Sequence, residues 1–490
     1  MNITKNKSLG FNGTVNIIST IVGLLVPFIY YPYVLRVLGP ENYGIFSFSE
    51  AFAYYFTVLA TLGIKAYAGR ELASHKNDLV FCKTLLRDVF LISLVTTSIS
   101  LISYSIIIIV NDTFSTEKLL YMIMGFYIVF SGLNIEWYYS GKERFDLIAI
   151  RNISSKLLMV ALVFITVKKQ SDYCLFAVCV VGMLYGLPMI FNYIGLFFDK
   201  SLRKSRLPSK IELKSHLKPI FYLSLMTIGS NLFSGVDRIM LKLLADNTAV
   251  GLYESAIKLP LVFDSIIYAL SAVLVPRLAF FAKNNDIANM NASIKKIGSV
   301  ALFISIPALL SCCFFSSEII YIFAGEDYLA SSQTLIIYSF IIILTVFASI
   351  FGREVLIAMK KERLLFVFLL IAGVINLILN FVLIPLYSFN GAAISTIVSN
   401  LVYVVVMMVA NAKYKTFLYF FDKKSLCYLV GAIIIAVVFI IVRIFVNLSP
   451  ILTLIIAVVS AGVPYLISQL LLKETTIMYG LNLIKKVIKR

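Results

Sequence analysis

The sequence has few of the residues on which soluble enzymes depend. Charged residues make up only 14% of the chain, and there are two histidines and one tryptophan. None of the six cysteines forms a C-x-x-C motif. His75 and His216 lie in predicted loops and cannot build a metal site between them. We find no G-x-S-x-G, no H-E-x-x-H and no P-loop. We therefore expect no enzyme, no metal, no cofactor and no self-contained ATP-driven pump.

Hydrophobic residues are abundant instead. They make up 60% of the 490 residues, and the mean hydropathy is +0.94. Apolar stretches of about 20 residues recur, each long enough to cross ~30 Å of hydrocarbon as a helix. The alternating segments of a membrane β-barrel are absent from the sequence. These features predict an all-α polytopic membrane protein of about 14 helices. We place them roughly at 13–35, 45–64, 88–109, 119–139, 148–167, 173–197, 219–243, 251–275, 297–316, 332–352, 364–385, 389–410, 425–446 and 450–472.

The net charge of +18 is distributed unevenly over these helices and loops. With both termini in the cytoplasm, 34 Lys and Arg residues lie on cytoplasmic segments and 6 at the outer face. This asymmetry is typical of the positive-inside rule. We interpret the charge as a signal for topology and expect no nucleic acid partner. The predicted location is the bacterial cytoplasmic (inner) membrane, with many passes and both termini inside.

The two halves of the chain resemble one another. Leu35–Gly44 precedes the second predicted helix, and the similar Leu241–Gly251 precedes the eighth. Gly141–Arg144 closes the fourth helix, and Lys360–Arg363 closes the tenth. Because six helices return the chain to the same side, these matches predict two parallel six-helix repeats with a cavity between them.

The predicted domains follow from this repeat and from a basic stretch of seven Lys and Arg with Pro208. They are an N-terminal lobe at 1–198, a cytoplasmic linker at 199–218, a C-terminal lobe at 219–411, and two further helices with a basic tail at 412–490.

Polar residues follow one face of two predicted helices. On the seventh helix they are Ser224, Thr227, Asn231, Ser234, Arg238 and Lys242, and on the second Glu50, Tyr54, Thr57, Thr61 and Lys65. An unpaired charge facing lipid costs at least ~3 kcal/mol. Two interpretations remain open, a water-filled lumen and hydrogen bonds between helices.

Several other charged residues lie within predicted helices. Glu254 and Lys258 are spaced four residues apart, which suits either a local salt bridge or a site. Asp264 has no basic residue three or four positions away. Arg151 and Lys156 occupy the inner half of the fifth helix.

A longer pattern resembles a known family. Asn134–Phe145 with Ile150–Ile153, then Gly229–Leu241 and Val250–Tyr253, are similar to the motifs of bacterial O-antigen and capsule repeat-unit flippases (Wzx type). The resemblance covers nearly the whole chain and implies the multidrug/oligosaccharidyl-lipid/polysaccharide transporter fold. The implied cargo is an undecaprenyl-pyrophosphate-linked oligosaccharide, moved from the inner to the outer leaflet by alternating access.

The resemblance and the polar residues together define a candidate site. Cationic and amide side chains suit a diphosphate and sugar hydroxyls, and a buried acid suits a coupling ion. The substrate-binding candidates are Arg238, Lys258, Arg151, Lys156, Asn231, Asn16 and Asn134, and the ion-coupling candidates are Asp264 and then Glu50. The expected partners are the lipid-linked oligosaccharide, membrane lipid, a polysaccharide polymerase or other export components, and H⁺ or Na⁺.

Two other functions remain open. A cation-coupled multidrug efflux transporter of the same fold would use lumen acids, for which Glu50 and Asp264 are available. A membrane polysaccharide polymerase or ligase would need a large outer loop, and every predicted outer loop is short. The related lipid II flippases have several arginines in their first two helices, whereas this chain has only Arg36, at the outer end of the first.

The topology can be tested by labelling single cysteines from outside, in a chain without its six native cysteines. Because the linker is predicted to be cytoplasmic, a membrane-impermeant maleimide should label a cysteine at position 247 and not one at position 205. Labelling at Ser205→Cys in sealed cells would contradict the predicted orientation.

Overall fold

The structure is a computed structural model that describes residues 9–199, 211–231, 235–414 and 426–478. Within these ranges, side chains are described except for residues 9–21, 24, 226, 228–231 and 414. All regular secondary structure in the described residues is helical. Eleven of the described helices are long and apolar enough to cross a membrane. The chain is thus a multi-pass helical membrane protein, as predicted.

The eleven helices cover more than eleven of the predicted spans, because two of them are long enough to contain two spans each. Two of them, Leu25–Ser74 and Glu362–Asn411, have 50 residues each, and each covers two predicted spans. The predicted helix 219–243 includes residues 232–234, which lie outside the described residues. The count of fourteen therefore stays a prediction.

Helix α1 (Leu9–Thr61) reverses direction at Gly39, which has the non-helical dihedral angles φ 72° and ψ 169°. The rings of Tyr31 and Tyr43 have centroids only 6.4 Å apart, whereas twelve residues of straight helix would span about 18 Å. A positive φ is readily adopted only by glycine. The reversal lies in the predicted outer loop at 39–44.

Helix α19 (Glu362–Asn411) reverses in the same way at Ser388, where φ is 50°. Asn376 Nδ2 donates a hydrogen bond to Thr396 Oγ1 at 3.3 Å, although twenty helical residues would span about 30 Å. Ser388 lies in the predicted outer loop at 386–390.

The chain divides by its internal packing into two compact units, Met1–Lys242 and Leu243–Arg490. This boundary lies at the end of the predicted seventh helix, later than the predicted linker at 199–218. Residues 200–210 of that linker lie outside the described residues. The four predicted domains stay a prediction.

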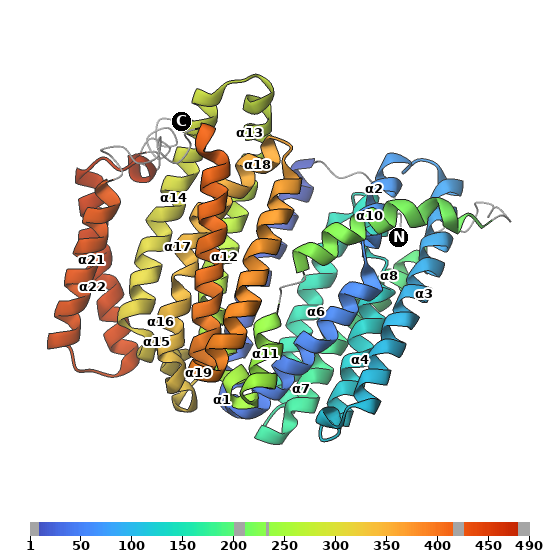
Figure 1. Cartoon of the computed structure of the whole chain (residues 1–490), viewed down its shortest axis with the longest axis horizontal. Helices are drawn as coiled ribbons and strands as arrows, with labels where there is room; N and C mark the ends of the chain where they lie inside the picture. Colours follow the sequence, from blue (N-terminus) through green and yellow to red (C-terminus); the bar gives the residue numbers. More distant parts are fainter. Residues whose placement is uncertain (1–8, 200–210, 232–234, 415–425, 479–490) are drawn as a thin grey trace. The chain divides into compact units, whose positions relative to one another are not determined.

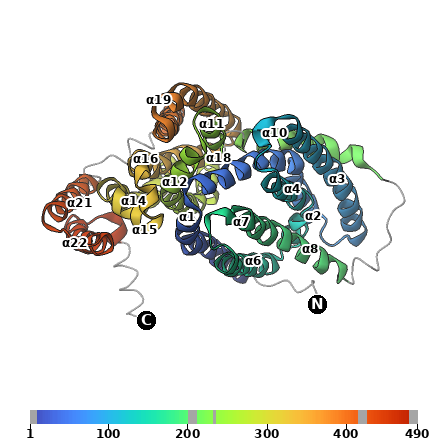
Figure 2. The same ribbon diagram turned by 90° about the horizontal axis from the view of Figure 1, so that it is seen from below.

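The first unit is a bundle in which α1 packs against α3, α4 and α6 (Figures 1 and 2). Its helices after α1 are α2 (Ile64–Ser74), α3 (Leu79–Val110), α4 (Lys118–Gly132), α5 (Glu136–Gly141), α6 (Phe145–Thr166), α7 (Tyr173–Val180), a π-helix at Val181–Gly186, α8 (Leu187–Phe197), α10 (Leu213–Asn231) and most of α11 (Val236–Leu244).

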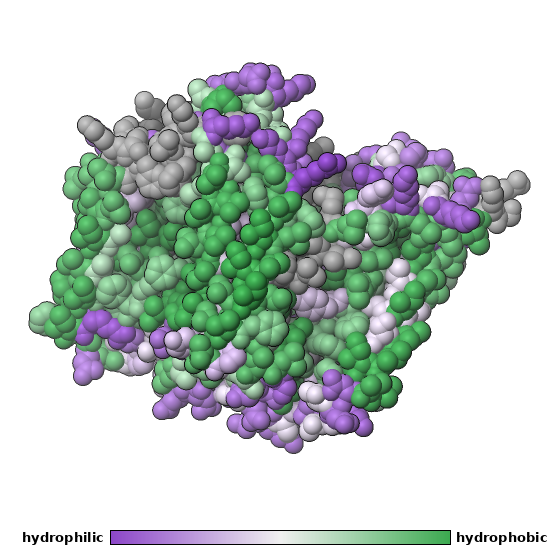
Figure 3. All heavy atoms as spheres, viewed as in Figure 1, coloured by the Kyte–Doolittle hydropathy of each residue, from purple (hydrophilic) through white to green (hydrophobic). Residues whose placement is uncertain are grey.

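The second unit begins within α11 and contains the remaining helices. They are α12 (Asn247–Ala272), α13 (Leu274–Lys283), α14 (Ile287–Phe314), α15 (Ser316–Phe323), α16 (Ser332–Ser339), α17 (Ile341–Val346), a π-helix at Phe347–Arg353, α18 (Glu354–Ala358), α19, α21 (Leu426–Phe445) and α22 (Pro450–Leu471). Helices α21 and α22 pack against each other, and α21 also packs against α14. In both units, hydrophobic residues cover the middle of the helices and hydrophilic residues gather at their ends (Figure 3).

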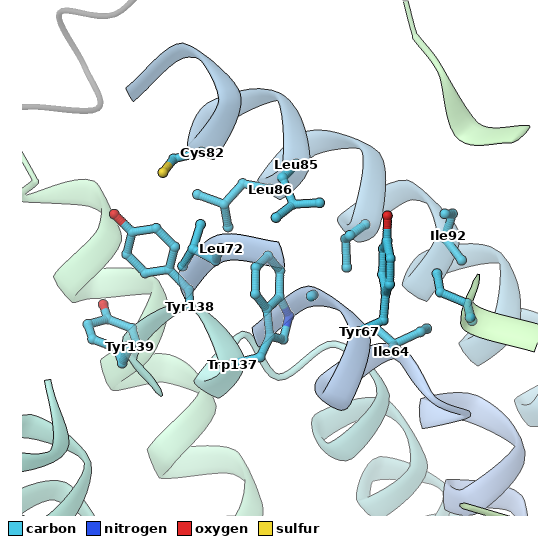
Figure 4. Close-up of a cluster of buried hydrophobic side chains, with 13 residues drawn as sticks. Ile64, Tyr67, Leu72, Cys82, Leu85, Leu86, Ile92, Trp137, Tyr138 and Tyr139 are labelled. Carbon is cyan, nitrogen blue, oxygen red and sulfur yellow. The ribbon is translucent and has the colours of Figure 1, made fainter. Parts of the chain in front are cut away.

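Short helices close one end of the first unit around an apolar cluster. Figure 4 shows Trp137 and Tyr138 extending from α5 toward Leu72 of α2 and Leu86 of α3. His216 of α10 joins this end through its Nδ1, which lies 2.6 Å from the hydroxyl of Tyr67. The segment between the second and third predicted helices thus contains the short helix α2, which packs at this end. His216 lies in helix α10, so the prediction that it lies in a loop is wrong.

Candidate functional site

An ion pair between α1 and α11 is the centre of the candidate site. The Arg238 guanidinium Nη1 donates to Glu50 Oε2 at 3.2 Å. The two residues are 188 positions apart in the sequence. Both side chains remain partly accessible, with exposed fractions of 19% for Arg238 and 29% for Glu50. The pairing removes the cost of two isolated charges in a membrane-spanning helix while leaving the pair within reach of a ligand.

A glycine places Arg238 for this contact. Gly235 precedes α11 and has φ 81°, a conformation that L-residues rarely adopt. A Cβ atom at this position would lie 3.0 Å from Arg238 Nη2, so a larger residue would press on the guanidinium. The prediction of one continuous helix at 219–243 is wrong at this point, because the chain leaves helical geometry at Gly235.

Four tyrosines interact electrostatically with the members of the ion pair. Tyr54 and Tyr55 follow Glu50 on α1 and lie within the electrostatic range of Arg238. Tyr127 of α4 and Tyr185 of the π-helix lie within the range of Glu50. The Tyr127 and Tyr185 rings pack with centroids 4.2 Å apart. Each of the four tyrosines thus interacts electrostatically with one member of the pair. We call Glu50, Arg238 and these four tyrosines the Arg238 site.

Four hydroxyl groups of the two predicted polar stripes donate hydrogen bonds to backbone carbonyls of their own helices. Thr57 and Thr61 donate to the carbonyl oxygens of Tyr54 and Thr57 on α1. On α10, Ser224 donates to the carbonyl of Phe221, and Thr227 to that of Leu223. Such bonds satisfy a hydroxyl within its own helix. Thr57 also forms a side-chain hydrogen bond with Tyr127 of α4, so one of the interhelical contacts that we considered from the sequence is present as well.

Arg151 lies in a second polar network of the first unit. Its guanidinium donates to Glu136, Asn152 and Asn192. Asn192 Nδ2 in turn donates to Asn134 Oδ1 at 2.7 Å. The predicted site residues Arg151 and Asn134 are therefore brought together, through an asparagine that the sequence analysis missed. Arg151 is 7% exposed, so this network chiefly joins α5, α6 and α8.

Lys156 has a different environment, although it lies on the same helix. Its Nζ would lie 2.8 Å from a Cβ atom built at Gly23 of α1, so this lysine extends toward α1. No ion pair is recorded for it among the described residues. The side chains of Asn16 and Asn231 lie outside the described residues, so both stay sequence predictions.

In the second unit, Lys258 forms the local salt bridge that its spacing suggested. Its Nζ lies 2.6 Å from Glu254 Oε2. Glu254 is buried, and the side chain of Lys258 is 19% exposed. The charge of Lys258 is thus balanced within α12 before any ligand binds.

Asp264 belongs to a third polar group, which includes the end of the second π-helix. The Thr345 hydroxyl of α17 donates to Asp264 Oδ1. Arg353 lies within electrostatic range of Asp264 and donates to Glu354 Oε1 at 2.6 Å. Its guanidinium also lies 4.7 Å from the centre of the Tyr268 ring. Asp264 therefore has a hydrogen-bond donor and a nearby cation, and both are far from it in the sequence.

Charged side chains among the described residues form ion pairs and no metal-binding cluster. In the described residues there is no group of three or more His, Cys, Asp or Glu side chains that could hold a metal ion. Each recorded ion pair named above joins one acid to one base. Charged groups inside a membrane-spanning helical bundle are typical of transport proteins, and this class fits the arrangement.

Comparison with known proteins identifies the family within this class. Residues 9–282 match the model of the family described as polysaccharide biosynthesis protein, and the chain belongs to that family. A putative O-antigen transporter of Escherichia coli K12 is 22% identical over 76% of this chain and 89% of its own length. A probable low-salt glycan biosynthesis flippase of Haloferax volcanii is 24% identical over 78% of this chain and 79% of its own length.

Solved structures share the fold. The lipid II flippase MurJ in an inward closed conformation aligns with a TM-score of 0.71 and 19% identity, covering 94% of this chain and 98% of MurJ. An inward-facing multidrug resistance transporter of the MATE family and MOP superfamily aligns with a TM-score of 0.57 and 13% identity, covering 82% and 95%. The predicted superfamily fold is confirmed.

Proposed function

We propose that this protein is a flippase that moves undecaprenyl-pyrophosphate-linked oligosaccharide repeat units from the inner to the outer leaflet of the cytoplasmic membrane. The units would then enter O-antigen or capsular polysaccharide. The family and the curated relatives, which include an O-antigen transporter and a glycan flippase, support this function. The observation that carries the mechanism is the partly exposed Glu50–Arg238 ion pair.

The diphosphate is the part of the cargo that cannot cross the membrane without the protein. Its charge cannot cross hydrocarbon unaided, whereas the polyprenyl tail can remain in the lipid throughout. A guanidinium donates two parallel hydrogen bonds to a phosphate, which makes arginine a specific receptor for this group. Arg238 is thus the proposed diphosphate ligand, and Lys258, Arg151 and Lys156 remain further candidates. Tyrosine rings and hydroxyls suit the sugars, with Asn231, Asn16 and Asn134 as further candidates.

Glu50 has a specific role in this proposal. When no cargo is bound, the Glu50 carboxylate pairs with Arg238 and offsets its positive charge inside the membrane. The diphosphate displaces Glu50 because it carries more charge and more acceptor oxygens. Glu50, released from Arg238 while the cargo is bound, is the second ion-coupling candidate.

The membrane potential favours the loaded step. Moving a negative charge outward from a negative-inside cell gains ~2.3 kcal/mol per charge per 100 mV. Energy is therefore needed chiefly to reset the empty carrier, in an antiporter-like cycle with H⁺ or Na⁺. Asp264 is the first candidate for that ion, because it is a carboxylate inside the second unit with Thr345 as a donor and Arg353 nearby.

The proposed orientation places both termini and the linker in the cytoplasm. It rests on the distribution of 34 basic residues against 6. A polysaccharide polymerase acting on the outer leaflet is the partner that would receive the repeat units.

A multidrug efflux function is less well supported. Transporters of that class bind cations with lumen acids. Of the two acids available for this role, Glu50 is paired with Arg238, and Asp264 accepts a hydrogen bond from Thr345. The MATE structure also aligns less closely than MurJ does.

Substitution of Arg238 tests the proposed receptor. Arg238→Ala should lower surface polysaccharide by at least about tenfold at unchanged membrane abundance, because a hydrogen bond to a charged group contributes about 1.5–3 kcal/mol. Arg238→Lys should lower surface polysaccharide less than Arg238→Ala, since it keeps the charge and loses only the two parallel hydrogen bonds of the guanidinium. The measurement is polysaccharide on whole cells, with protein abundance from membrane blots.

Arg443→Ala is the matched control for this experiment. Arg443 is also a paired arginine, bonded to Glu318 and the carbonyl of Phe314, and lies at the end of α21. It should leave export within about twofold of wild type. Full export by Arg238→Ala would reject Arg238 as a receptor.

Substitution of Asp264 tests the coupling step separately. Asp264→Asn keeps the size and the hydrogen bond from Thr345 but cannot ionise. The variant should flip labelled lipid-linked oligosaccharide in vesicles without the acceleration that an imposed H⁺ or Na⁺ gradient gives the wild type. Equal rates of variant and wild type under both conditions would exclude Asp264 as the coupling residue.

A further inference from the structure

A groove between α3 and α4 lies outside the Arg238 site. It has a volume of about 500 Å³. Along α3 it is lined by Leu101, Ser105 and Ile109, and along α4 by Lys118, Met122 and Phe126. Apart from Lys118, Ser105 and the tyrosines of its floor, the groove is apolar, and we call it the α3–α4 groove. Figures 1 and 2 both show these two helices side by side.

The groove opens away from the rest of the unit. Ile109, Met122 and Phe126 at its rim are 81%, 67% and 56% exposed. Its floor is closed by Tyr104, which is buried and donates its hydroxyl to the carbonyl of Tyr121 at 2.9 Å. The Tyr104 ring also packs on Phe56 of α1 at 5.1 Å between centroids. In a membrane-spanning bundle, a groove that opens away from the other helices faces lipid.

The length of the groove matches one leaflet. It runs along α4 from Lys118 at the start of the helix to Val129, which corresponds to about 16 Å of helix. Half of a ~30 Å hydrocarbon core is about 15 Å. The groove therefore extends from the level of the headgroups to the middle of the bilayer.

A cation lies at the headgroup end. Lys118 is exposed, and no ion pair is recorded for it among the described residues. The adjacent acid, Glu117, accepts a hydrogen bond from the Tyr173 hydroxyl. Lys168 at the end of α6 is different, because its Nζ donates to the carbonyl of Phe164. Lys118 is thus positioned to meet a phosphate at the surface of this leaflet.

We propose that the α3–α4 groove binds one phospholipid, with an acyl chain between the helices and the headgroup phosphate on Lys118. An empty apolar groove of this volume would forfeit the dispersion contacts that an acyl chain makes with both walls. Lys118 supplies selectivity for a lipid with a phosphate. In the proposed orientation this is the outer leaflet, but the binding itself does not depend on the flippase function.

Fluorescence quenching tests this proposal directly. The single tryptophan, Trp137, lies in α5 beyond the far end of α4. In a Trp137→Phe chain, Phe126→Trp places a reporter at the rim of the groove. The purified protein is reconstituted in phosphatidylcholine vesicles containing either dibrominated phosphatidylglycerol or a dibrominated diacylglycerol with the same chains. Bromine quenches the reporter only when the lipid occupies the groove or its edge.

The phospholipid should quench at about fivefold lower mole fraction than the diacylglycerol, since one lysine at a charged surface has an effect of this order. Lys118→Gln should remove that difference, whereas Lys168→Gln should keep it. Ser105→Phe, which fills the groove from α3, should weaken quenching by both lipids. Met122→Trp serves as a second reporter if Phe126→Trp does not fold, and Trp137 can be retained with its own signal subtracted.

Equal quenching by the two lipids in the wild-type background, or an unchanged difference in Lys118→Gln, would overturn the assignment of the phosphate to Lys118. Undiminished quenching in Ser105→Phe would overturn the binding of an acyl chain in the groove. These outcomes are distinguishable from failure of the flippase proposal, because the experiment measures lipid binding without any cargo.

Discussion

A charge inside the hydrocarbon of a membrane must be neutralised by a partner or by water, and the polar contacts of this protein follow from that requirement. Lys258 is neutralised within its own helix by Glu254, and Arg353 by its sequence neighbour Glu354. The Glu50–Arg238 pair is different, because it joins two elements that are 188 residues apart. It also remains partly accessible, and we propose that a ligand can open it.

This difference gives the ion pairs different consequences. A local pair such as Glu254–Lys258 can exchange partners without moving another helix. We propose that a diphosphate that takes Arg238 from Glu50 breaks the ion pair between α1 and α11, close to the positive-φ glycine at position 235. In this proposal, cargo binding and a change in the first unit are linked through one side chain, which is the kind of differential contact that alternating access requires.

Much of this arrangement could be predicted from the sequence. Apolar runs identified the membrane spans, and the short loops around Gly39 and Ser388 marked two reversals, since both signals are local. The break at Gly235 was missed because the flanking residues continue a helical polar pattern. The partners of Arg238, Arg151 and Asp264 were also missed. Glu50, Asn192 and Thr345 lie 188, 41 and 81 positions away from them, and helical spacing carries no information about such distances. Tyr185 was overlooked because a π-helix changes which residues share a face.

The central claim is that Glu50 and a diphosphate compete for Arg238. The most direct test is the equilibrium binding of undecaprenyl diphosphate, without sugars, to the purified protein in detergent at neutral pH. The account predicts that Glu50→Gln binds this lipid severalfold more tightly than wild type, because the competing carboxylate is gone. Arg238→Gln should bind it about tenfold more weakly, and the double variant should resemble Arg238→Gln. Weaker binding by Glu50→Gln, or unchanged binding by Arg238→Gln, would contradict the account.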